Sequence, residues 1–378
     1  MSGHSANIAI IGGGSSGLFL ARKLSETPRL HVTLFEKNRQ VGAKLRASGG
    51  GKANILNRDI RPEHYNKADF ISALLRQYTP KDLDRQFNDW GMLTVADSEG
   101  CVYPATQFAQ TVVEVLTDYP SDNVRIETEY DIQHLDYQNG KWRVNDYPTL
   151  FDTVVLATGS PAGMIPKNQE GYNQYLKDLH LRIKRLEPSL SGFILKGYPK
   201  SLSGCRTKAI VSLYQGDRLV HKEAGEIIFK DNGVSGIVVM NLSSLYRRLG
   251  DRKSCKLSIN LTYWDEEFDL LSFMESGHNM KGILHPKLLA YYNRKPFYIQ
   301  GLSFDIEDTY PMDAAQVAHG GIAVSEVDEH FVAKKHRNLF ILGEMLDVDG
   351  LCGGYNLFFA FASAAVVAKS IIQKYQPN

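Results

Sequence analysis

A glycine motif of the form G-x-G-x-x-G lies near the start of the chain and consists of Gly12, Gly14 and Gly17. The apolar run 7–11 precedes it, and apolar residues at helical spacing follow it, so we predict a strand, a tight turn and a helix. A second apolar run, 31–35, ends at Glu36. In such a βαβ unit the glycines let the backbone approach a pyrophosphate, and the acid accepts hydrogen bonds from ribose hydroxyls. The pattern predicts binding of an adenosine diphosphate moiety.

A second strand, acid and glycine loop lies near the other end of the chain. The apolar run 338–342 is followed by Glu344 and Asp347, and Gly353 and Gly354 then lead into an apolar helix that starts near Asn356. A flavin has a ribityl chain and a ring to be held as well as a pyrophosphate, whereas a nicotinamide dehydrogenase does not need this segment. The helix dipole would favour the reduced anion at flavin N1. We predict FAD, against the alternative of an ordinary C-terminal strand and helix.

Between these two ends of the chain, the pattern of apolar and polar residues changes. Short alternating segments separated by Gly and Ser predict an inserted antiparallel β domain over 190–317, with a small helical portion at about 264–295. The flanking segments, 1–189 and 318–378, have the apolar runs of a buried parallel sheet, of which 153–157 is one strand. We therefore predict an α/β fold in which a discontinuous Rossmann-like FAD-binding domain carries this insertion.

Several motifs together resemble one known family. Beside the glycine motif these are the loop 48–54 with Asn57, the segments 101–104 and 232–236, and the tail 343–356. In this order they are similar to the aminoacetone-oxidase-like family of FAD flavoproteins. The resemblance implies a two-dinucleotide-binding-domain flavoprotein with tightly bound FAD, in which the antiparallel insertion is β-barrel-like and has a small helical portion. It also implies amine oxidation or reduction of steroid-like enones, so the substrate does not transfer with the fold.

The resemblance and the glycine motif together assign the residues around FAD. They are Gly12, Gly14, Ser16, Gly17, Glu36, Lys37, Lys44, Ser48, Gly49, Gly50, Gly51, Asn54, Thr158, Gly159, Gly343, Glu344, Asp347, Gly353, Gly354, Tyr355, Asn356 and Leu357. The chain departs from the family at Lys52 and Ala53, where Arg and Cys are usual, so thiol chemistry is absent there and Lys52 lacks the bidentate fork of an Arg. The loop 160–170 also departs, with Pro161 and Pro166.

No residue has a firm catalytic role in this sequence. His319, before two glycines, would act as an acid or base facing the flavin, or would be a turn residue with satisfied hydrogen bonds. Tyr355 would donate a proton or lie against the flavin ring, or its side chain would only pack against its neighbours. Cys352 would be a redox thiol or a packed side chain, and the second reading is favoured because no other cysteine is near it in sequence.

The charge and the cysteine content of the chain limit the kinds of binding partner and bound metal that we expect. The chain of 378 residues has 43 basic and 42 acidic side chains, so no general field attracts nucleic acid or an anionic membrane. The 4 cysteines lack a CxxC spacing, so we expect neither a metal site nor a disulfide framework. The N-terminus lacks signal-peptide features and no apolar run reaches about 18 residues, which predicts a cytoplasmic protein without a membrane span.

These observations predict an FAD-dependent oxidoreductase that acts on a small organic substrate by hydride transfer through flavin N5. The reaction would be amine oxidation or enone reduction. A second G-x-G-x-x-G is missing, so NAD(P)H would dock transiently as electron donor, or electrons would pass to oxygen. The alternatives are a nicotinamide-only dehydrogenase and a flavin-binding protein with a regulatory or partner-binding role. The sequence has no signature of oligomeric state.

Overall fold

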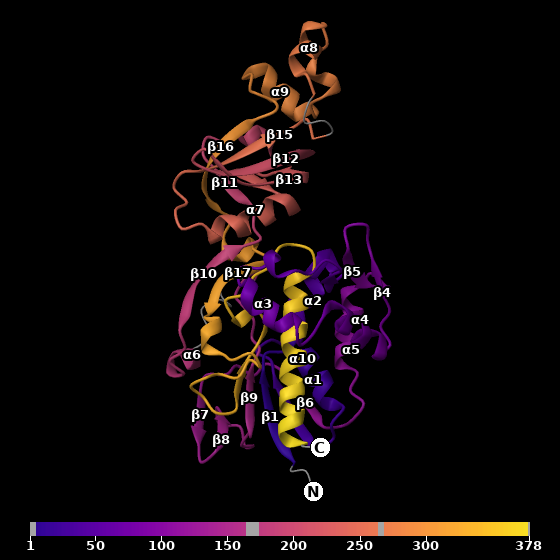
Figure 1. The fold of residues 1–378 in the computed structure, drawn as a ribbon, viewed down its shortest axis with the longest axis vertical. Coiled ribbons are helices and arrows are strands. Elements are labelled where there is room, and N and C mark those ends of the chain that lie inside the picture. Colours follow the sequence, from indigo (N-terminus) through magenta and orange to yellow (C-terminus); the bar gives the residue numbers. More distant parts are fainter. Residues whose placement is uncertain (1–4, 164–173, 264–267, 377–378) are drawn as a thin grey trace. The chain divides into compact units, whose positions relative to one another are not determined.

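The computed structural model describes residues 5–163, 174–263 and 268–376. They belong to two compact units. The first unit comprises 1–186 and 318–378, and the second is the continuous segment 187–317 between them. The colours of Figure 1 show both chain ends, indigo and yellow, in the same unit.

The first unit is built on a parallel sheet of five strands in the order β18-β9-β1-β2-β6. The strands are β1 (Ala6–Ile11), β2 (Leu30–Phe35), β6 (Val124–Glu127), β9 (Thr153–Leu156) and β18 (Leu339–Ile341). Strands β9 and β18 are buried at every position, as expected for parallel strands that are covered on both faces. The sheet order places the first strand of the chain, β1, at the centre between β9 and β2, and the last strand, β18, at one edge.

Two helices pack together in this unit, α1 (Ser15–Ser25) and α10 (Tyr355–Tyr375). Phe19 of α1 meets Phe361 of α10 with ring centroids 5.4 Å apart. Helix α10, yellow in Figure 1, is apolar nearly all round because the unit surrounds it. Among the described residues it is the one helix long and apolar enough to cross a membrane, yet 72% of its most apolar window is buried in this fold.

Shorter elements complete the first unit. Helix α4 starts with a capping box, in which the Thr79 hydroxyl and the Asp82 carboxylate each accept a backbone N–H of the other residue. The helices are α2 (Ala43–Ala47), α3 (Ala68–Leu75), α4 (Pro80–Asp89), α5 (Ala109–Thr117) and α6 (Gln174–Asp178). The strands are β3 (Leu56–Asn57), β4 (Thr94–Ala96), β5 (Cys101–Pro104), β7 (Leu135–Gln138) and β8 (Lys141–Val144).

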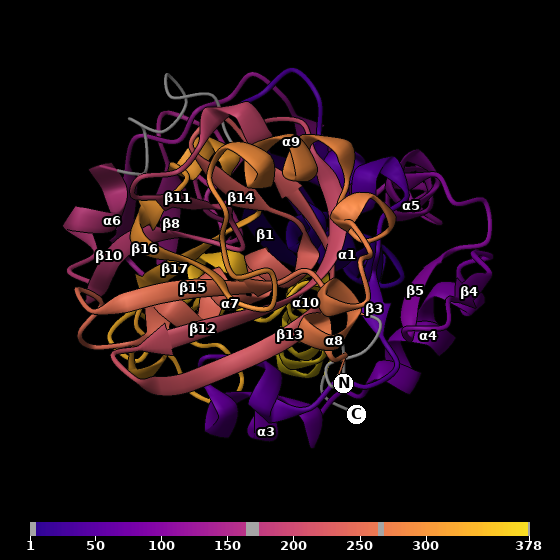
Figure 2. The same ribbon diagram turned by 90° about the horizontal axis from the view of Figure 1, so that it is seen from above.

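The second unit is a closed antiparallel barrel in the order β11-β14-β13-β12-β15-β16, and Figure 2 shows β12, β13 and β15 side by side. Strand β15 alternates between buried and half-buried positions, so one face of this strand fills the interior. Closure leaves no free strand edge. The strands are β11 (Phe193–Leu195), β12 (Arg206–Gln215), β13 (Arg218–Phe229), β14 (Gly233–Ser235), β15 (Cys255–Asn260) and β16 (Leu302–Thr309). The helices are α7 (Ile237–Arg248), α8 (Leu270–Glu275) and α9 (Pro286–Arg294).

The chain crosses between the units along two strands, β10 (Ile183–Ser189) and β17 (Val317–Ile322), which pair as a two-stranded sheet. The pairing depends on Gly320, which has a φ of +99°. A Cβ atom there would lie 2.2 Å from the carbonyl oxygen of Arg185, closer than any side chain permits. Only glycine lets these strands approach as they do.

The fold class expected from the sequence is confirmed, since a Rossmann-like parallel sheet, a closed antiparallel barrel and accessory helices are all present. One expectation for local structure was wrong, since His319 lies inside strand β17 and not in a turn. Helices α5 and α7 were not expected. The residues 264–267 of the expected helical portion and 164–170 of the departing loop lie outside the described residues.

Candidate active site

The glycine motif forms the turn between β1 and α1. Gly12 has a φ of +110°, and a Cβ atom there would lie 2.5 Å from the carbonyl oxygen of Ala157. A Cβ atom on Gly17 would lie 1.9 Å from the carbonyl oxygen of Gly12. Both glycines are therefore required by the packing of the protein itself. Around Gly14, by contrast, no atom lies within 4 Å of such a Cβ position, so the space beside its backbone is open to a ligand.

Helix α1 begins directly after Gly14, and no side chain caps it. Its first backbone N–H groups therefore lack intrahelical partners, and the helix dipole places positive charge at this end. An anion is the ligand that such a helix start binds. The open space beside Gly14 and the uncapped helix start together fit a pyrophosphate.

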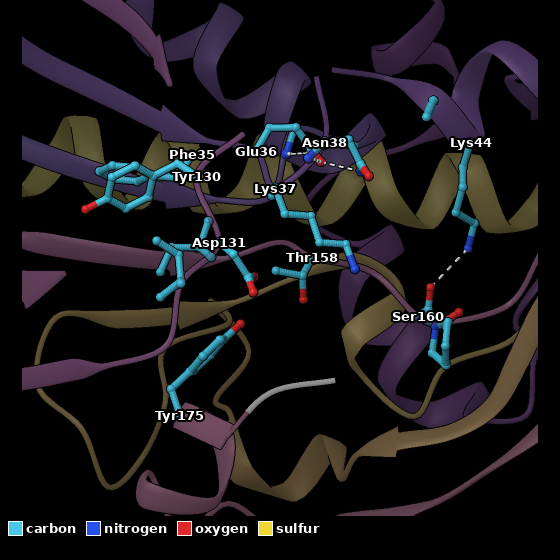
Figure 3. A pocket seen from close by; sticks show the side chains of 17 residues that line it. Phe35, Glu36, Lys37, Asn38, Lys44, Tyr130, Asp131, Thr158, Ser160 and Tyr175 are labelled. Atoms are coloured by element: carbon cyan, nitrogen blue, oxygen red, sulfur yellow. Dashed lines mark hydrogen bonds between the residues drawn. The ribbon is translucent and has the colours of Figure 1, made fainter. Parts of the chain in front are cut away.

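Glu36 follows β2 and holds the glycine turn in place. One carboxylate oxygen accepts a hydrogen bond of 2.9 Å from the N–H of Gly13, and the other accepts hydrogen bonds of 2.8 and 2.6 Å from the backbone and side chain of Asn38. Glu36 is only 8% exposed. A carboxylate can accept about four hydrogen bonds, so Glu36 retains capacity for ribose hydroxyls. Figure 3 shows its contact with Asn38 at the edge of a pocket.

This pocket collects residues from the carboxyl ends of β1, β2, β6 and β9, the place where open parallel sheets bind ligands. In Figure 3, Phe35 and Tyr130 lie at one end and Lys44 and Ser160 at the other. The rings of Phe35 and Tyr130 are 5.0 Å apart between centroids. The lining residues are Ile11, Gly12, Gly13, Gly14, Phe35, Glu36, Lys37, Asn38, Ala43, Lys44, Tyr130, Asp131, Ile132, Thr158, Ser160, Pro161 and Tyr175.

Sequence reasoning missed part of this lining. Residues 130–132 follow the parallel strand β6, and a strand assignment there was the signal that would have found them. Tyr175 comes from the far side of the pocket and had no sequence signal. Burial raises the pKa of Tyr175, so its hydroxyl keeps its proton and offers the pocket a neutral donor.

The residues predicted to surround FAD divide between this pocket and other places. Those that line the pocket are Gly12, Gly14, Glu36, Lys37, Lys44 and Thr158. Ser16 and Gly343 instead pack tightly, since a Cβ atom on Gly343 would lie 2.8 Å from the Ser16 hydroxyl. The predicted residues that lie outside the lining are Ser16, Gly17, Ser48, Gly49, Gly50, Gly51, Asn54, Gly159, Gly343, Glu344, Asp347, Gly353, Gly354, Tyr355, Asn356 and Leu357.

The loop at 48–51 is a short 3-10 turn in which three glycines have positive φ. No atom lies within 4 Å of a Cβ position on Gly50 or Gly51, so their backbone is open to a ligand. Ala53, where the family has Cys, is fully buried and has a φ of +57°. Its side chain faces the interior of the protein.

Glu344 connects the pocket to the C-terminal loop. Its carboxylate lies 2.8 Å from the Lys44 ammonium and accepts a hydrogen bond of 2.7 Å from the Ser160 hydroxyl. The backbone N–H of Ala318 donates a third, at 3.3 Å. Glu344 or Asp347 was expected to hold ribityl hydroxyls, and in this structure three protein donors already engage Glu344.

Two asparagines fix the loop before α10. Asn57 donates a hydrogen bond of 3.1 Å to the carbonyl oxygen of Gly353. The side chain of Asn356 accepts the N–H of Gly350 at 2.8 Å and donates to the carbonyl oxygens of Gly350 and Leu351 at 3.1 and 3.2 Å. No side chain caps the start of α10, so its N–H groups and dipole remain available to an electron-rich ligand.

Tyr355, one of the two catalytic candidates, is 8% exposed. Its ring lies 4.7 Å from that of His64, edge to face, and its carbonyl oxygen accepts a hydrogen bond of 2.8 Å from the Tyr65 hydroxyl. Burial raises the pKa of Tyr65 well above its usual range, so this hydroxyl stays protonated. These contacts make Tyr355 part of a packed aromatic group at the start of α10.

The other candidate, His319, belongs to what we call the charged cluster, which consists of Asn66, Lys67, Lys184, His319, Asp347 and Asp349. Asp349 is 1% exposed, and its carboxylate lies 2.8 Å from Nδ1 of His319. Asp347 is fully buried, and one of its oxygens lies 3.1 Å from the Lys67 ammonium and 2.6 Å from that of Lys184.

The donor atoms of His319, Asp347 and Asp349 lie within 4.8 Å of one another, a spacing that a metal ion can bridge. The two ammonium groups beside Asp347 already supply the positive charge that such an ion would bring. Two lysines lie against Asp347, and Asp349 lies against His319. The arrangement therefore favours proton chemistry over metal binding.

The fold and the pocket define a Rossmann-type dinucleotide-binding protein with an inserted barrel. The chain belongs to the family described as HI0933-like protein Rossmann domain, whose model matches residues 6–370. It is 26% identical to a 3-dehydro-bile acid delta(4,6)-reductase of Clostridium scindens, over 97% of this chain and 99% of that protein. It is also 24% identical to a ribosomal RNA dihydrouridine synthase of Haemophilus influenzae, over 98% and 99% of the two chains.

Among solved structures, a variant of the E. coli quinol fumarate reductase subunit FrdA has a similar fold. The TM-score is 0.50 at 14% identity, with 100% of this chain and 71% of that chain covered. The family and the full-length relatives make the chain an FAD-dependent oxidoreductase, whereas the FrdA match shows the fold alone. The finer resemblance to aminoacetone oxidases stays a prediction.

Proposed function

We propose that this protein is a reductase that saturates a carbon–carbon double bond conjugated to a carbonyl group in a small molecule. The observation that carries the proposal is that two differently named relatives match along nearly their whole length. One name describes reduction of ring double bonds in a keto bile acid and the other saturation of the uracil ring. Both reactions add a hydride and a proton across an alkene that a carbonyl group activates.

The charged cluster supports reduction over amine oxidation. An amine substrate is mostly a cation near neutral pH, and its binding favours an unpaired carboxylate. Asp347 already faces two ammonium groups, and Asp349 already pairs with His319. A carbonyl compound is neutral and meets no repulsion from Lys67 or Lys184.

Charge supports a small substrate over ribosomal RNA. The formal net charge of the chain is +1, whereas proteins that bind RNA bring clustered Lys and Arg to neutralise phosphates. The basic segments 182–185, 247–253 and 334–337 are also partly neutralised within the fold. Arg247 and Arg252 both pair with Glu187, and Lys335 pairs with Glu326.

The residues that would hold FAD follow from the pocket. The start of α1 would bind the pyrophosphate and Glu36 the ribose, and the open backbone of Gly50 and Gly51 and the start of α10 would contact the remainder. When bound, FAD would supply a hydride carrier that NAD(P)H reduces and the substrate reoxidises. NAD(P)H would dock only transiently, because the sequence has no second dinucleotide motif.

An anaerobic titration of the purified protein tests this function. We expect the visible absorption of oxidised flavin, its bleaching by NADH or NADPH, and its return on addition of a 3-keto-Δ4 steroid, with the saturated ketone as product. Protein without flavin that also fails to bind added FAD would contradict the cofactor. Flavin that a nicotinamide leaves oxidised but a primary amine bleaches would identify an amine oxidase instead.

A further inference from the structure

The charged cluster contains a group suited to deliver the second hydrogen of the reaction. We propose that His319 is the general acid that protonates the substrate carbon, and that Asp349 is the positioning residue that fixes its imidazole. This inference rests on the proposed reductase function. Hydride transfer alone does not complete the reduction, and the remaining proton transfer is assigned to His319.

The hydrogen bond between the two side chains sets the tautomer of the imidazole. Asp349 is 1% exposed and its carboxylate can only accept hydrogen bonds, so Nδ1 of His319, 2.8 Å away, must carry a hydrogen. The second nitrogen, Nε2, then carries the exchangeable proton. It makes no hydrogen bond to any residue in the described part of the chain, and 19% of the side chain is exposed.

The neighbours of Asp349 keep its carboxylate directed at the imidazole. Asn66 donates a hydrogen bond of 3.2 Å to the Asp347 carboxylate and accepts one of 3.0 Å from the backbone N–H of Asp349. Lys67 and Lys184 both lie against Asp347. Both ammonium groups pair with Asp347, and the Asp349 carboxylate pairs with His319.

Two glycines allow the strand that carries His319 to pack closely against its neighbours. Besides the close approach at Gly320, a Cβ atom on Gly321 would lie 2.7 Å from the carbonyl oxygen of Met345. Strand β17 is thus pressed against both β10 and the segment that leads to Asp347. The N–H of Asp347 donates to the carbonyl oxygen of Ile322 at 2.8 Å, which holds the two segments together. The imidazole and its carboxylate therefore come from rigidly joined backbone.

The other proton carriers nearby are less suited to the step. The Lys67 and Lys184 ammonium groups are held by a buried carboxylate, and ammonium gives up its proton only at high pH. The Tyr65 hydroxyl is committed to the carbonyl oxygen of Tyr355. Imidazole is the side chain in the cluster that can both give and regain a proton as a general acid.

The reaction balances with this assignment. The alkene gains two electrons and one hydrogen as hydride at the carbon remote from the carbonyl, and the electrons come from NAD(P)H, which is oxidised. The carbon next to the carbonyl gains a proton from Nε2, and the π bond is lost as two C–H bonds form. His319 is left neutral, with its hydrogen on Nδ1, and takes a new proton from water.

The test compares His319→Gln with Asp349→Asn, and uses His330→Gln, an exposed histidine outside the cluster, as the matched control. Each FAD-loaded protein is reduced by NADPH without oxygen and then mixed in a stopped-flow instrument with one of two acceptors. A 3-keto-Δ4 steroid needs a proton at carbon, whereas ferricyanide takes only electrons. Reoxidation by the steroid should slow about 10²- to 10⁴-fold in His319→Gln, while reoxidation by ferricyanide stays as in the wild type.

A second readout does not depend on turnover. In protein with ¹⁵N-labelled histidine, the signal lost in His319→Gln identifies this residue among the 11 histidines. Above the titration range it should show a hydrogen on Nδ1 and none on Nε2. In Asp349→Asn the side-chain amide can donate to Nδ1, so the opposite tautomer should appear.

The outcomes separate the two proposals. Wild-type protein that the steroid does not reoxidise would contradict the reductase function itself. Wild-type and His319→Gln proteins that the steroid reoxidises at the same rate would overturn the acid role alone. Equal slowing with both acceptors, or a wild-type tautomer with its hydrogen on Nε2, would also overturn it, because the residue would then act on structure and not on the proton.

Discussion

The two polar regions of the FAD-binding unit are constructed differently. The glycine turn and Glu36 meet their ligand mainly with backbone N–H groups, and their residues come from the contiguous segment 12–38. The charged cluster acts through side chains, and its members come from four separate segments of the chain. The first region is set by steric fit, and the second by the balance of charges that tertiary contacts bring together.

This difference determines how each region responds to substitution. Added atoms at Gly12 or Gly17 damage the glycine turn, because a Cβ there would lie within contact distance of backbone. Removed charges damage the cluster, because each carboxylate there faces a specific cation or imidazole. Affinity for the cofactor should therefore be controlled in the first region, and catalysis in the second.

The largest effect is expected from Gly17→Ala. Its Cβ would lie 1.9 Å from the carbonyl oxygen of Gly12, so helix and strand must separate, at a cost of about 3 kcal/mol or more in the free energy of unfolding. Gly14→Ala is the matched control, since that Cβ would meet nothing within 4 Å. We expect Gly14→Ala to leave the stability of the apoprotein unchanged and to weaken FAD binding. Thermal unfolding measures the stability, and flavin retention measures the binding of FAD. Equal losses of stability in Gly17→Ala and Gly14→Ala would contradict the steric argument.

Glu36→Ala should weaken FAD binding by roughly 1.5–3 kcal/mol, because hydrogen bonds to a charged acceptor are lost. The loss includes the support that the carboxylate gives to Gly13 and Asn38. Titration of the apoprotein with FAD, followed by flavin fluorescence, measures the change. Asn38→Ala removes a side-chain donor to Glu36 and should weaken FAD binding less than Glu36→Ala does. Unchanged FAD affinity in Glu36→Ala would refute the assignment of Glu36 to the ribose.

Asp347→Asn should lower the free energy of unfolding by about 1–2 kcal/mol. Two ammonium groups would lose their carboxylate, but Lys184 is 52% exposed and water compensates part of the loss. FAD affinity at the glycine turn should remain, so denaturant unfolding and FAD titration should respond differently. A large loss of FAD affinity together with unchanged stability would show that Asp347 acts on the cofactor directly.

The smallest effect concerns thiol reactivity. Burial raises the pKa of the Cys101, Cys205 and Cys255 thiols, so at about pH 8 these groups stay protonated and react slowly with iodoacetamide. Cys352 is only partly buried and should be alkylated first. Mass spectrometry after brief labelling gives the order. Rapid labelling that persists in Cys352→Ser would mean that one of the other three is accessible.

Local patterns predicted the first region well and the second poorly. The glycine motif, the strands around it and α10 all follow from short-range periodicity and sterics, which sequence displays directly. Helix α7 was missed because Ile237–Arg248 lies among strand-like segments, and the assignment of His319 to a turn was wrong because two glycines there serve strand pairing. A glycine that permits close approach looks in sequence like a glycine that turns the chain.

The sequence by itself determined the class of protein: a dinucleotide turn, an acid for the ribose and an inserted β domain all rest on residues close together in the chain. Only the tertiary structure decided that Lys67 and Lys184 neutralise Asp347 and that Asp349 is paired with His319. The physical reason is that a charge acts through space on whatever the fold places beside it. Spacing along the chain does not reveal these pairs, because their members come from separate segments.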